Sequence, residues 1–217
     1  MLVTAISSPE ELTVELLSRQ YPRAAGSLLR ASMVTSIDGM TSVAGRSGPL
    51  SGGSDRRIFH FLRAGASAVI VGARTVLAEG YRKDPSFTGD LAEYRNHCGL
   101  PETLRIVVAS RSGGDPGPFP GFERIVLRPD TTRSRLLERL ELEDPAVILC
   151  EGGPSLLHRL TQSRAVDEYC ITLAFTLVGA GDAPLSPGSL VAPYPLAAAS
   201  AIVTAEAAHL RLVPRSS

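Results

Sequence analysis

The sequence predicts an α/β protein in which a mostly parallel sheet is covered by helices on both faces, with an antiparallel edge near the C-terminus. Short apolar runs alternate with helical stretches of roughly ten residues, which is the pattern of βαβ units. The runs at 68–71 and 147–150 contain no charged residue, as expected for parallel strands buried on both faces. Because 217 residues suffice for one substantial core, we expect a single domain over residues 1–217.

Local signals place the individual elements along the chain. Ser8, Pro9 and Glu11 form a capping pattern that predicts a helix from residue 8 to about residue 19. The apolar spacing from Ser54 onward is helical. We further expect strands at 28–35, 68–71, 105–109, 123–127 and 147–150, helices at 74–79, 132–142 and 155–162, and an irregular polar segment at 82–102. In the final third, residues 167–177 and 201–212 are strand-like and predict an antiparallel pair at one sheet edge.

Composition excludes several classes of protein. The 22 basic and 22 acidic residues balance, so no broad field exists to hold a nucleic-acid backbone or an anionic membrane surface. The sequence has no basic segment followed by an apolar stretch at its start and no apolar run of membrane-spanning length, so we expect a cytoplasmic protein. Its three cysteines suggest no disulfide framework, and Cys150 and Cys170 lie in apolar runs typical of buried positions. The last six residues fit a protease-site remnant and a native strand end equally well.

Three strand ends carry small residues that suit a phosphate group. They begin at Gly72, Ser110 and Glu151, and two of them lead into helices. Glycine allows a phosphate to approach the backbone closely, and a helix N-terminus favours the anion. Each strand end alone is better explained as a tight turn, but three in one parallel sheet favour a shared ligand. None has the spacing of a Rossmann fingerprint or a P-loop, which disfavours those nucleotide folds.

Two other groups of residues are candidates for chemistry. Asp38 follows the first strand beside a flexible loop, where the alternative is a simple Asx-turn. Arg56, His60 and Arg63 share one helix face by their spacing, so that face can meet a phosphate or can simply be solvated.

Taken in order, these pieces resemble the reductase domain of the riboflavin-biosynthesis deaminase/reductase enzymes. The resemblance covers roughly residues 28–180 and is carried by Ser-Ile-Asp-Gly at 36–39, Ser-Gly at 51–52, the basic helix face, the strand leading to Gly72, Glu-Gly-Gly at 151–153 and Val-Asp-Glu at 166–168. It implies a three-layer αβα fold like that of dihydrofolate reductase. Many members have a tryptophan in place of Pro49 and an Asp-Asp-Pro stretch where this chain has residues 79–85, which affects the phosphate-binding loop.

The resemblance also implies the residues of the site. The NADPH site then comprises Val34, Pro49, Gly72, Thr75, Ser110, Gly152, Gly153 and Ser155, with Arg74 and Arg111 as candidates for the adenosine 2′-phosphate, because guanidinium groups pair with phosphate oxygens in a bidentate way. The substrate site comprises Ser47, Arg56, Arg63 and Glu151. Asp38 and Glu79 are the candidate catalytic carboxylates, and Arg63, with Arg56, is expected to anchor the substrate phosphate.

The activity implied by the resemblance is NADPH-dependent reduction of a ribosylamino-pyrimidine phosphate to a ribitylamino product by a homodimer. The chain lacks the zinc signature of a deaminase, so we expect a reductase alone. One rival is dihydrofolate reductase or another reductase of the same fold, although the lack of tryptophan disfavours the folate enzyme. A second rival is a non-catalytic NADP-binding module.

Overall fold

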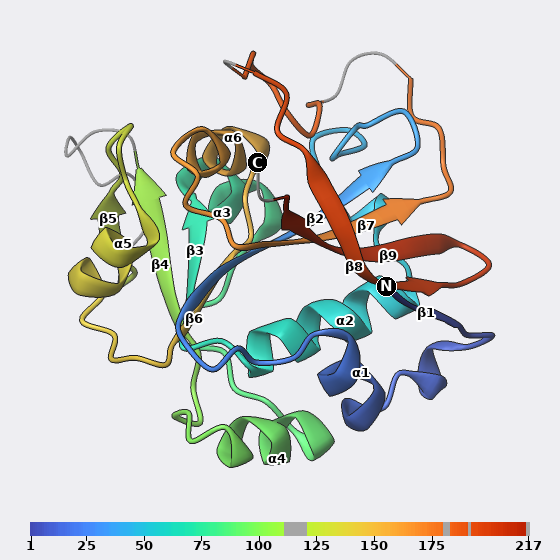
Figure 1. The fold of residues 1–217 in the computed structure, drawn as a ribbon, viewed down its shortest axis with the longest axis horizontal. Helices are drawn as coiled ribbons and strands as arrows, with labels where there is room; N and C mark the ends of the chain where they lie inside the picture. The colour runs from blue at the N-terminus through green and yellow to red at the C-terminus, as the bar shows by residue number, and fades with distance from the viewer. Residues whose placement is uncertain (111–120, 180–182, 191, 216–217) are drawn as a thin grey trace.

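The structure is a computed structural model that describes residues 1–110, 121–179, 183–190 and 192–215. The described residues form one sheet of nine strands in the order β1-β8-β9-β7-β2-β6-β3-β4-β5 (Figure 1). The strands are β1 (Leu2–Ala5), β2 (Leu28–Ser36), β3 (Ala68–Gly72), β4 (Arg105–Ser110), β5 (Glu123–Val126), β6 (Val147–Cys150), β7 (Glu168–Ala174), β8 (Leu196–Val203) and β9 (Ala207–Pro214). Only β9 runs antiparallel to its two neighbours, β7 and β8, so the sheet is mostly parallel, as predicted.

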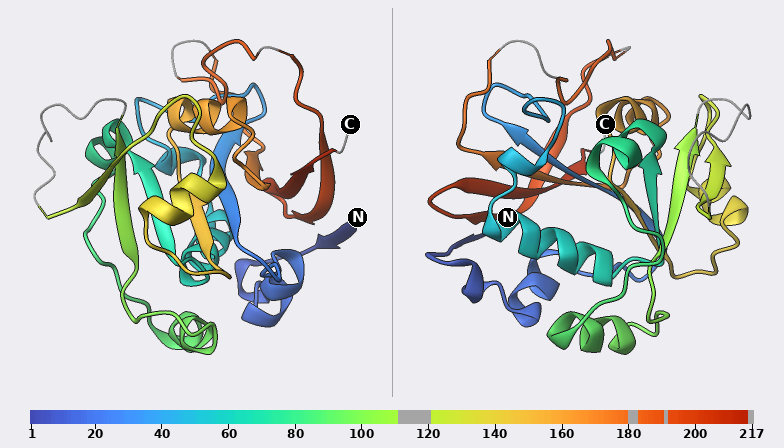
Figure 2. Two further views of the ribbon diagram at one scale, coloured as in Figure 1. Left: turned by 60° about the vertical axis from the view of Figure 1, so that its left-hand side comes forward. Right: turned by 180° about the vertical axis from the view of Figure 1, so that it is seen from behind.

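Helices cover both faces of this sheet (Figures 1 and 2). They are α1 (Val14–Gln20), α2 (Gly53–Ala64), α3 (Ala73–Glu79), α4 (Gly89–His97), α5 (Arg133–Arg139) and α6 (Pro154–Gln162), with short 3-10 helices η1 (Pro9–Glu11) and η2 (Gly48–Leu50). Successive residues of β3 alternate between two cores: Ala68 and Ile70 pack in the core under α5 and α6, while Val69 and Val71 pack in the core under α1, α2 and α4. Burial on both faces explains why this strand is entirely apolar.

The N-terminal helix is shorter than expected. Ser8 and Glu11 form the predicted capping box, and the Glu11 carboxylate accepts the backbone N–H groups of Ser7 and Ser8. This first turn ends as η1, and Thr13 caps a separate helix by accepting the Leu16 N–H at 3.2 Å. The second cap divides the expected helix into two pieces.

Two other parts of the fold differ from the expectation. The expected strand at 201–212 is a hairpin, because the Thr204 hydroxyl accepts the N–H groups of Glu206 and Ala207 and turns the chain between β8 and β9. The edge of the sheet is β1, which pairs in parallel with β8 and was not predicted. The antiparallel strands therefore lie one strand in from that edge.

The segment at 82–102 contains α4, which the sequence did not reveal because its residues lack a regular apolar face. Arg95 of this helix is 1% exposed and donates to the carbonyls of Ala64, Ala66 and Thr103 at 3.2, 2.8 and 3.0 Å. Burial lowers the pKa of this guanidinium to about 10. A cation at the C-terminus of α2 opposes the partial negative charge of that helix end, so Arg95 attaches α4 to the fold.

Burial of the cysteines follows the prediction: Cys150 and Cys170 are buried, and burial raises the pKa of each thiol to about 12. Within the described residues, no helix combines the length and apolar character needed to cross a membrane.

Candidate active site

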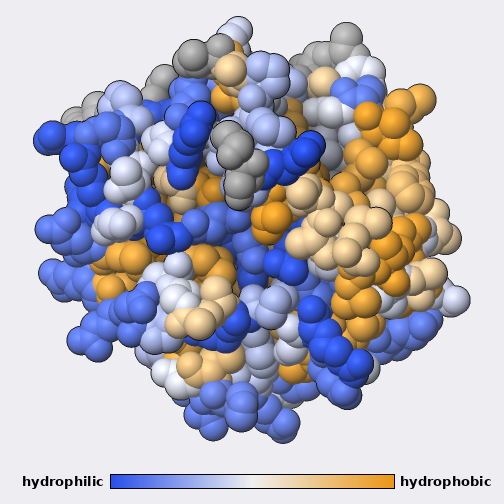
Figure 3. All heavy atoms as spheres, viewed as in Figure 1, coloured by the Kyte–Doolittle hydropathy of each residue, from blue (hydrophilic) through white to orange (hydrophobic). Residues whose placement is uncertain are grey.

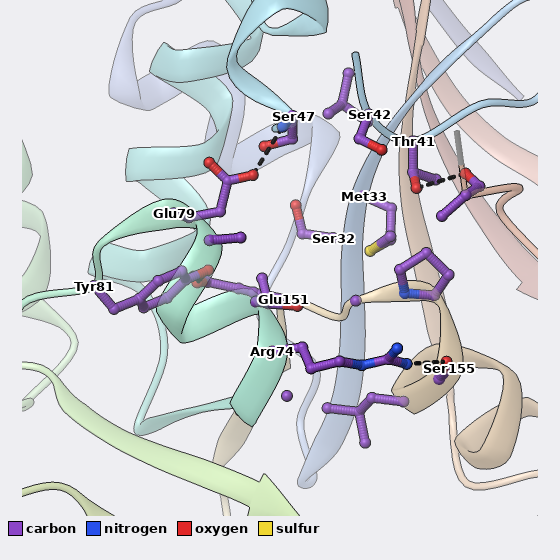
Figure 4. Close-up of a pocket in the computed structure, with 18 of the residues that line it drawn as sticks. Ser32, Met33, Thr41, Ser42, Ser47, Arg74, Glu79, Tyr81, Glu151 and Ser155 are labelled. Atoms are coloured by element: carbon purple, nitrogen blue, oxygen red, sulfur yellow. Dashed lines mark hydrogen bonds between the residues drawn. The ribbon is translucent and has the colours of Figure 1, made fainter. Parts of the chain in front are cut away.

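A cavity of about 1090 Å³ opens at the carboxyl ends of the parallel strands β2, β6, β3 and β4. This is the position at which α/β sheets bind ligands, and Figure 4 shows side chains from several elements pointing into it. We call one part the glycine end, lined by Gly72, Thr75, Ser110, Gly153 and Ser155. The other part is the carboxylate end, lined by Ser47, Arg63, Glu79, Tyr81 and Glu151.

The three predicted phosphate turns meet at the glycine end. The Gly72 N–H donates to the carbonyl of Gly152 at 2.6 Å, which joins the turn after β3 to the turn after β6. Ser110, at the end of β4, lines the same cavity. Arg111 lies outside the described residues. The expectation that these turns converge on one ligand-sized space therefore holds for the described part of each.

Close packing explains the two consecutive glycines. Gly152 has a φ of +77°, and a Cβ atom built there would lie 2.4 Å from the Met33 sulfur. A Cβ on Gly153 would lie 2.9 Å from the Thr75 hydroxyl oxygen. A side chain at either position would push against neighbours that line the cavity, so glycine keeps the two turns in contact.

The polar side chains at the glycine end are hydroxyl groups and one guanidinium. Arg74, at the start of α3, donates to the Ser155 hydroxyl at 3.2 Å, as Figure 4 shows. Thr75, Ser110 and Ser155 add hydroxyl groups. Val34 lines the cavity as well, whereas Pro49 lies exposed in η2, outside the lining. Gly152 is buried behind the lining.

At the carboxylate end, Glu79 is fixed by the loop that follows β2. Its carboxylate accepts the Ser47 N–H at 2.7 Å, and both residues face the cavity (Figure 4). The loop brings Ser47 to the end of α3, so two positions that are 32 residues apart share one contact. Arg56 of α2 also lines this end and is exposed.

Glu151, Arg63 and Tyr81 form a buried cluster beside Glu79. Arg63 donates to both carboxylate oxygens of Glu151 at 2.6 Å, and the Tyr81 hydroxyl donates to Glu151 Oε2 at 2.6 Å. The Glu151 side chain is 1% exposed and that of Arg63 is 14% exposed. The guanidinium lies 4.2 Å from the Phe59 ring centroid and 5.1 Å from that of Tyr81. This cluster neutralises the buried Glu151 carboxylate.

The charges of this cluster shift the pKa values of Tyr81, which belongs to it, and of His60, which lies beside it. Burial, together with the negative charge of Glu151, raises the pKa of Tyr81 well above its usual value, so this phenol stays a hydrogen-bond donor. Burial also lowers the pKa of His60, and the positive charge of Arg63 lowers it further. His60 lines the cavity as a predominantly neutral imidazole at pH 7.

The structure gives Arg63 and Asp38 different surroundings from those expected. Arg63 lines the cavity and pairs with Glu151 through its Nε and Nη2 atoms, a partner that the sequence did not indicate. Asp38 lies outside the cavity lining, and its carboxylate accepts the Ser36 hydroxyl at 2.5 Å and the Gly179 N–H at 2.7 Å. These hydrogen bonds lower the pKa of Asp38 to about 2, so its carboxylate is ionised at neutral pH. It joins the turn after β2 to the loop after β7.

Sequence reasoning missed several lining residues. Tyr81, Arg82 and Arg159 lie in the cavity wall but belong to no recognisable motif. Thr41 and Ser42 come from the loop after β2, which is held by backbone pairing to the segment around Ala183. Only the length of the loop at 39–53 hinted that it had a role.

Comparison with solved structures identifies the fold. A pyrimidine reductase-like protein from Corynebacterium diphtheriae superposes with a TM-score of 0.76 at 20% identity, over 95% of this chain and all of the other. RibD from Acinetobacter baumannii gives 0.69 at 21% identity, over 89% of this chain and 59% of that one. A dihydrofolate reductase from Enterococcus faecalis, solved with NADP(H), gives 0.60 at 13% identity, over 87% of this chain and 97% of the other. The protein therefore has the dihydrofolate-reductase-like fold predicted from the sequence.

Comparison of sequences identifies the family. Residues 28–201 match the family model of the RibD C-terminal domain. The riboflavin biosynthesis protein RibD of Mycobacterium tuberculosis is 31% identical over 153 residues, 67% of this chain and 41% of that protein. The chain belongs to the RibD C-terminal domain family, a reductase family of riboflavin biosynthesis. It spans about two fifths of the length of the curated relatives that it matches.

Proposed function

We propose that this chain is an NADPH-dependent reductase that converts 5-amino-6-(5-phosphoribosylamino)uracil into its ribitylamino product. The observation that carries the proposal is the shared cavity, in which a donor-rich glycine end adjoins a carboxylate end. Family membership supports the reaction class, and the geometry supports a site with room for two ligands side by side. Its volume of about 1090 Å³ slightly exceeds the roughly 300–1,000 Å³ that is typical of small-molecule sites.

The donor set of the glycine end fits a dinucleotide. The lining there offers the backbone at Gly153, the hydroxyls of Thr75 and Ser155, and the Arg74 guanidinium. These are the groups that bind phosphate oxygens. NADPH, when bound, would supply the hydride. The chain's contribution at this end is to hold the pyrophosphate and so to fix where the nicotinamide lies.

Glu79 is the residue that we assign to the reacting end. Cleavage of the C1′–O bond opens the ribose ring, with the ring oxygen taking up a proton, and leaves a positively charged C1′=N iminium that the hydride then reduces to the ribitylamino product. A carboxylate held in the cavity by Ser47 stabilises that charge electrostatically. Asp38 is less suited, because it faces the backbone of a neighbouring loop.

Two arginines are available for the substrate phosphate. Arg56 and Arg82 line the cavity, and neither has a carboxylate partner among the described residues. Arg63, by contrast, is held by Glu151. We therefore assign the phosphate to Arg56 and Arg82, and a structural role in shaping the pyrimidine pocket to the cluster of Arg63, Glu151 and Tyr81.

The activity is tested by following NADPH absorbance with three additions: the deaminated riboflavin precursor, dihydrofolate, and buffer alone. We expect oxidation with the pyrimidine only. Turnover of dihydrofolate instead would favour the folate enzyme, and NADPH binding without turnover would favour a non-catalytic module. Arg56→Ala is expected to raise KM for the pyrimidine at least tenfold and to leave the NADPH Kd unchanged, whereas Arg19→Ala, on α1 and outside the cavity lining, serves as the control.

A homodimer is the assembly that we propose. Figure 3 shows apolar side chains gathered on the side of the molecule formed by the C-terminal strands. Leu2 and Val3 of β1 are 49% and 54% exposed, and Val203 of β8 is 37% exposed. In the described sheet, β1 pairs only with β8, so its outer edge is open to a second chain. Light scattering should give twice the chain mass for the native protein and the monomer mass for Val3→Glu.

A further inference from the structure

His209 is a buried histidine that the proposed function does not use. It lies within β9 and is 1% exposed. Its Nδ1 atom is 2.9 Å from the Thr172 hydroxyl of β7, and its Nε2 atom is 3.0 Å from the Ser54 hydroxyl of α2. Thr172 and Ser54 are themselves buried. The three side chains therefore form a continuous polar chain from the sheet to α2.

Both contacts of the imidazole are satisfied without a charge. Burial lowers the pKa of His209, and the Asp55 carboxylate offsets only part of that effect, so the ring is mostly neutral at pH 7. A neutral imidazole has one donor and one acceptor nitrogen, and a hydroxyl group can take either role. Each ring nitrogen thus has a matching partner, and His209 joins two elements at fixed distances.

Ser54 belongs to the first turn of α2, a helix whose start has no cap of its own. Gly52 occupies the N-cap position and has no side chain to accept an N–H group. A Cβ atom built on Gly52 would lie 2.8 Å from a carboxylate oxygen of Glu206, in the turn between β8 and β9. A negative charge at this position favours the helix N-terminus. The β8–β9 hairpin therefore supports the start of α2 twice, through Glu206 and through His209.

The same first turn carries residues of the cavity. Ser51, Asp55 and Arg56 all line it. Ser54 and Arg56 are two positions apart, which places them on nearly opposite sides of the helix at about 100° per residue. Ser54 accordingly faces the buried interior, whereas Arg56 is exposed at the cavity. Rotation or fraying of this turn would move the Arg56 guanidinium directly.

Other residues fix the far end of α2. Arg63 donates to the Glu151 carboxylate at 2.6 Å, and Arg95 donates to the carbonyl of Ala64 at 3.2 Å. Arg63 lies about two and a half helical turns from Ser54. Contacts at that distance leave the first turn free to fray, so the position of the first turn depends on the groups that hold it locally.

We propose that His209 is a positioning residue for substrate binding, which holds Ser54 and thereby orients Arg56 toward the substrate phosphate. The inference rests on the proposed function, which assigns the phosphate to Arg56. A guanidinium that is already oriented loses less conformational freedom when it binds, so it binds the phosphate more tightly. The effect should appear in the affinity for the sugar phosphate. NADPH affinity should not change, because its proposed groups lie on other elements.

Two substitutions break the contact between His209 and Ser54 from opposite sides. Ser54→Ala removes the hydroxyl and introduces a good helix former. His209→Asn keeps a polar atom near the Nδ1 position, beside Thr172, but is too short to reach Ser54. Calorimetry would measure the Kd of ribose 5-phosphate, the sugar-phosphate half of the proposed substrate, and steady-state kinetics would give KM and kcat for the pyrimidine. Each variant should raise that Kd and KM about 3–10-fold, the effect of losing a hydrogen bond between uncharged groups, and leave kcat and the NADPH Kd within about twofold.

His209→Gln is the matched comparison. Its longer side chain places an amide near the Nε2 position, so the contact with Ser54 is kept and the contact with Thr172 is lost. The Kd of ribose 5-phosphate should return to within about twofold of the native value. The double variant Ser54→Ala/His209→Asn should bind no more weakly than either single variant, because both changes remove the same contact. Native NADPH affinity shows that each variant is folded.

Native affinity for ribose 5-phosphate in both Ser54→Ala and His209→Asn overturns the inference. So does an equal loss in His209→Gln and His209→Asn, or a parallel loss of NADPH affinity, because each of these results indicates general packing. If the native chain binds ribose 5-phosphate but does not oxidise NADPH with the pyrimidine, the proposed function fails, and the Kd values of the variants still decide the role of His209. A native chain that neither binds ribose 5-phosphate nor turns over the pyrimidine overturns both.

Discussion

The two ends of the cavity are held together by different kinds of contact. At the glycine end, backbone turns at the ends of β3 and β6 touch directly, through the Gly72 N–H and the Gly152 carbonyl. At the carboxylate end, the contacts are made to carboxylate side chains: Glu79 accepts the backbone N–H of Ser47, 32 residues away, and Glu151 accepts the Tyr81 hydroxyl, 70 residues away. The geometry of the first end follows from the sheet, while that of the second depends on which charges meet. Substitutions should therefore act through backbone strain at one end and through charge at the other.

The largest effect is expected from Glu79→Gln. Removing the negative charge removes stabilisation of the cationic C1′–N unit, so kcat should fall about 10²–10³-fold. The amide oxygen of glutamine can still accept the Ser47 N–H, so the thermal midpoint should stay within a few degrees. Glu138→Gln on α5, an exposed carboxylate outside the cavity lining, is the control and should keep full activity. An active Glu79→Gln enzyme would remove this residue from the chemistry.

Glu151→Gln should produce the next largest effect, on stability. Loss of the carboxylate leaves the Arg63 guanidinium buried without a counter-charge, and breaking a buried ion pair costs about 3–5 kcal/mol. For a chain of this size, that corresponds to a thermal midpoint lower by roughly 6–20 °C. Differential scanning calorimetry would measure it.

Glu123→Gln provides the comparison for that experiment. Arg105 donates two hydrogen bonds to the Glu123 carboxylate, each 2.7 Å long, as Arg63 does to Glu151. The side chains of Arg105 and Glu123 are, however, 36% and 42% exposed. Exposed pairs contribute about 1 kcal/mol or less, so this variant should be close to the native protein. Equal losses in the two variants would contradict the role that we give to burial.

Gly152→Ala tests the backbone side of the comparison. The new Cβ would require a positive φ and would overlap the Met33 sulfur, so we expect a loss of about 2–3 kcal/mol together with weaker NADPH binding. Gly99→Ala is the matched control, because Gly99 has a φ of +70°, nothing within 4 Å of its Cβ position and a place outside the cavity lining. It should cost about 1–2 kcal/mol and leave NADPH affinity unchanged. If both variants lose the same stability and affinity, close packing of the turns is not what Gly152 provides.

The difference between the ends also explains what the sequence could predict. Apolar runs followed by glycine marked β3 and β6, because a strand buried on both faces must be apolar and a close turn needs glycine. The same signals placed Gly72, Thr75, Gly153 and Ser155 in one cavity. Local chemistry was therefore enough to predict the glycine end.

The carboxylate end could not be predicted in this way. Nothing near Arg63 in the sequence indicates that Glu151 will neutralise it, because that contact depends on how α2 crosses β6. Tyr81 follows α3 without any periodic pattern, and Arg95 is buried through carbonyls rather than through an apolar face. Asp38 was expected to act in the site because it follows a strand end, but the loop turns its carboxylate toward residues 178 and 179.

The smallest effect is expected from Asp38→Asn, and it depends on pH. Hydrogen bonds lower the pKa of Asp38 from 3.8 to about 2, so the folded state favours the ionised form. The stabilisation is complete above pH 4 and is lost as the pH falls from about 4 to about 2. At pH 7, Asp38→Asn should be less stable and should show a raised substrate KM, because the loop bearing Thr41 and Ser42 loosens. Near pH 2, unfolding measurements should give the two proteins the same stability.

Asp144→Asn separates the effect on stability from the effect on KM. The Ser27 hydroxyl and N–H likewise lower the pKa of Asp144, but this carboxylate lies outside the cavity lining. Asp144→Asn should reproduce the pH-dependent loss of stability with an unchanged KM. A raised KM in Asp144→Asn would show that loosening any loop impairs the enzyme, and that the contact between Asp38 and residues 178–179 has no special role.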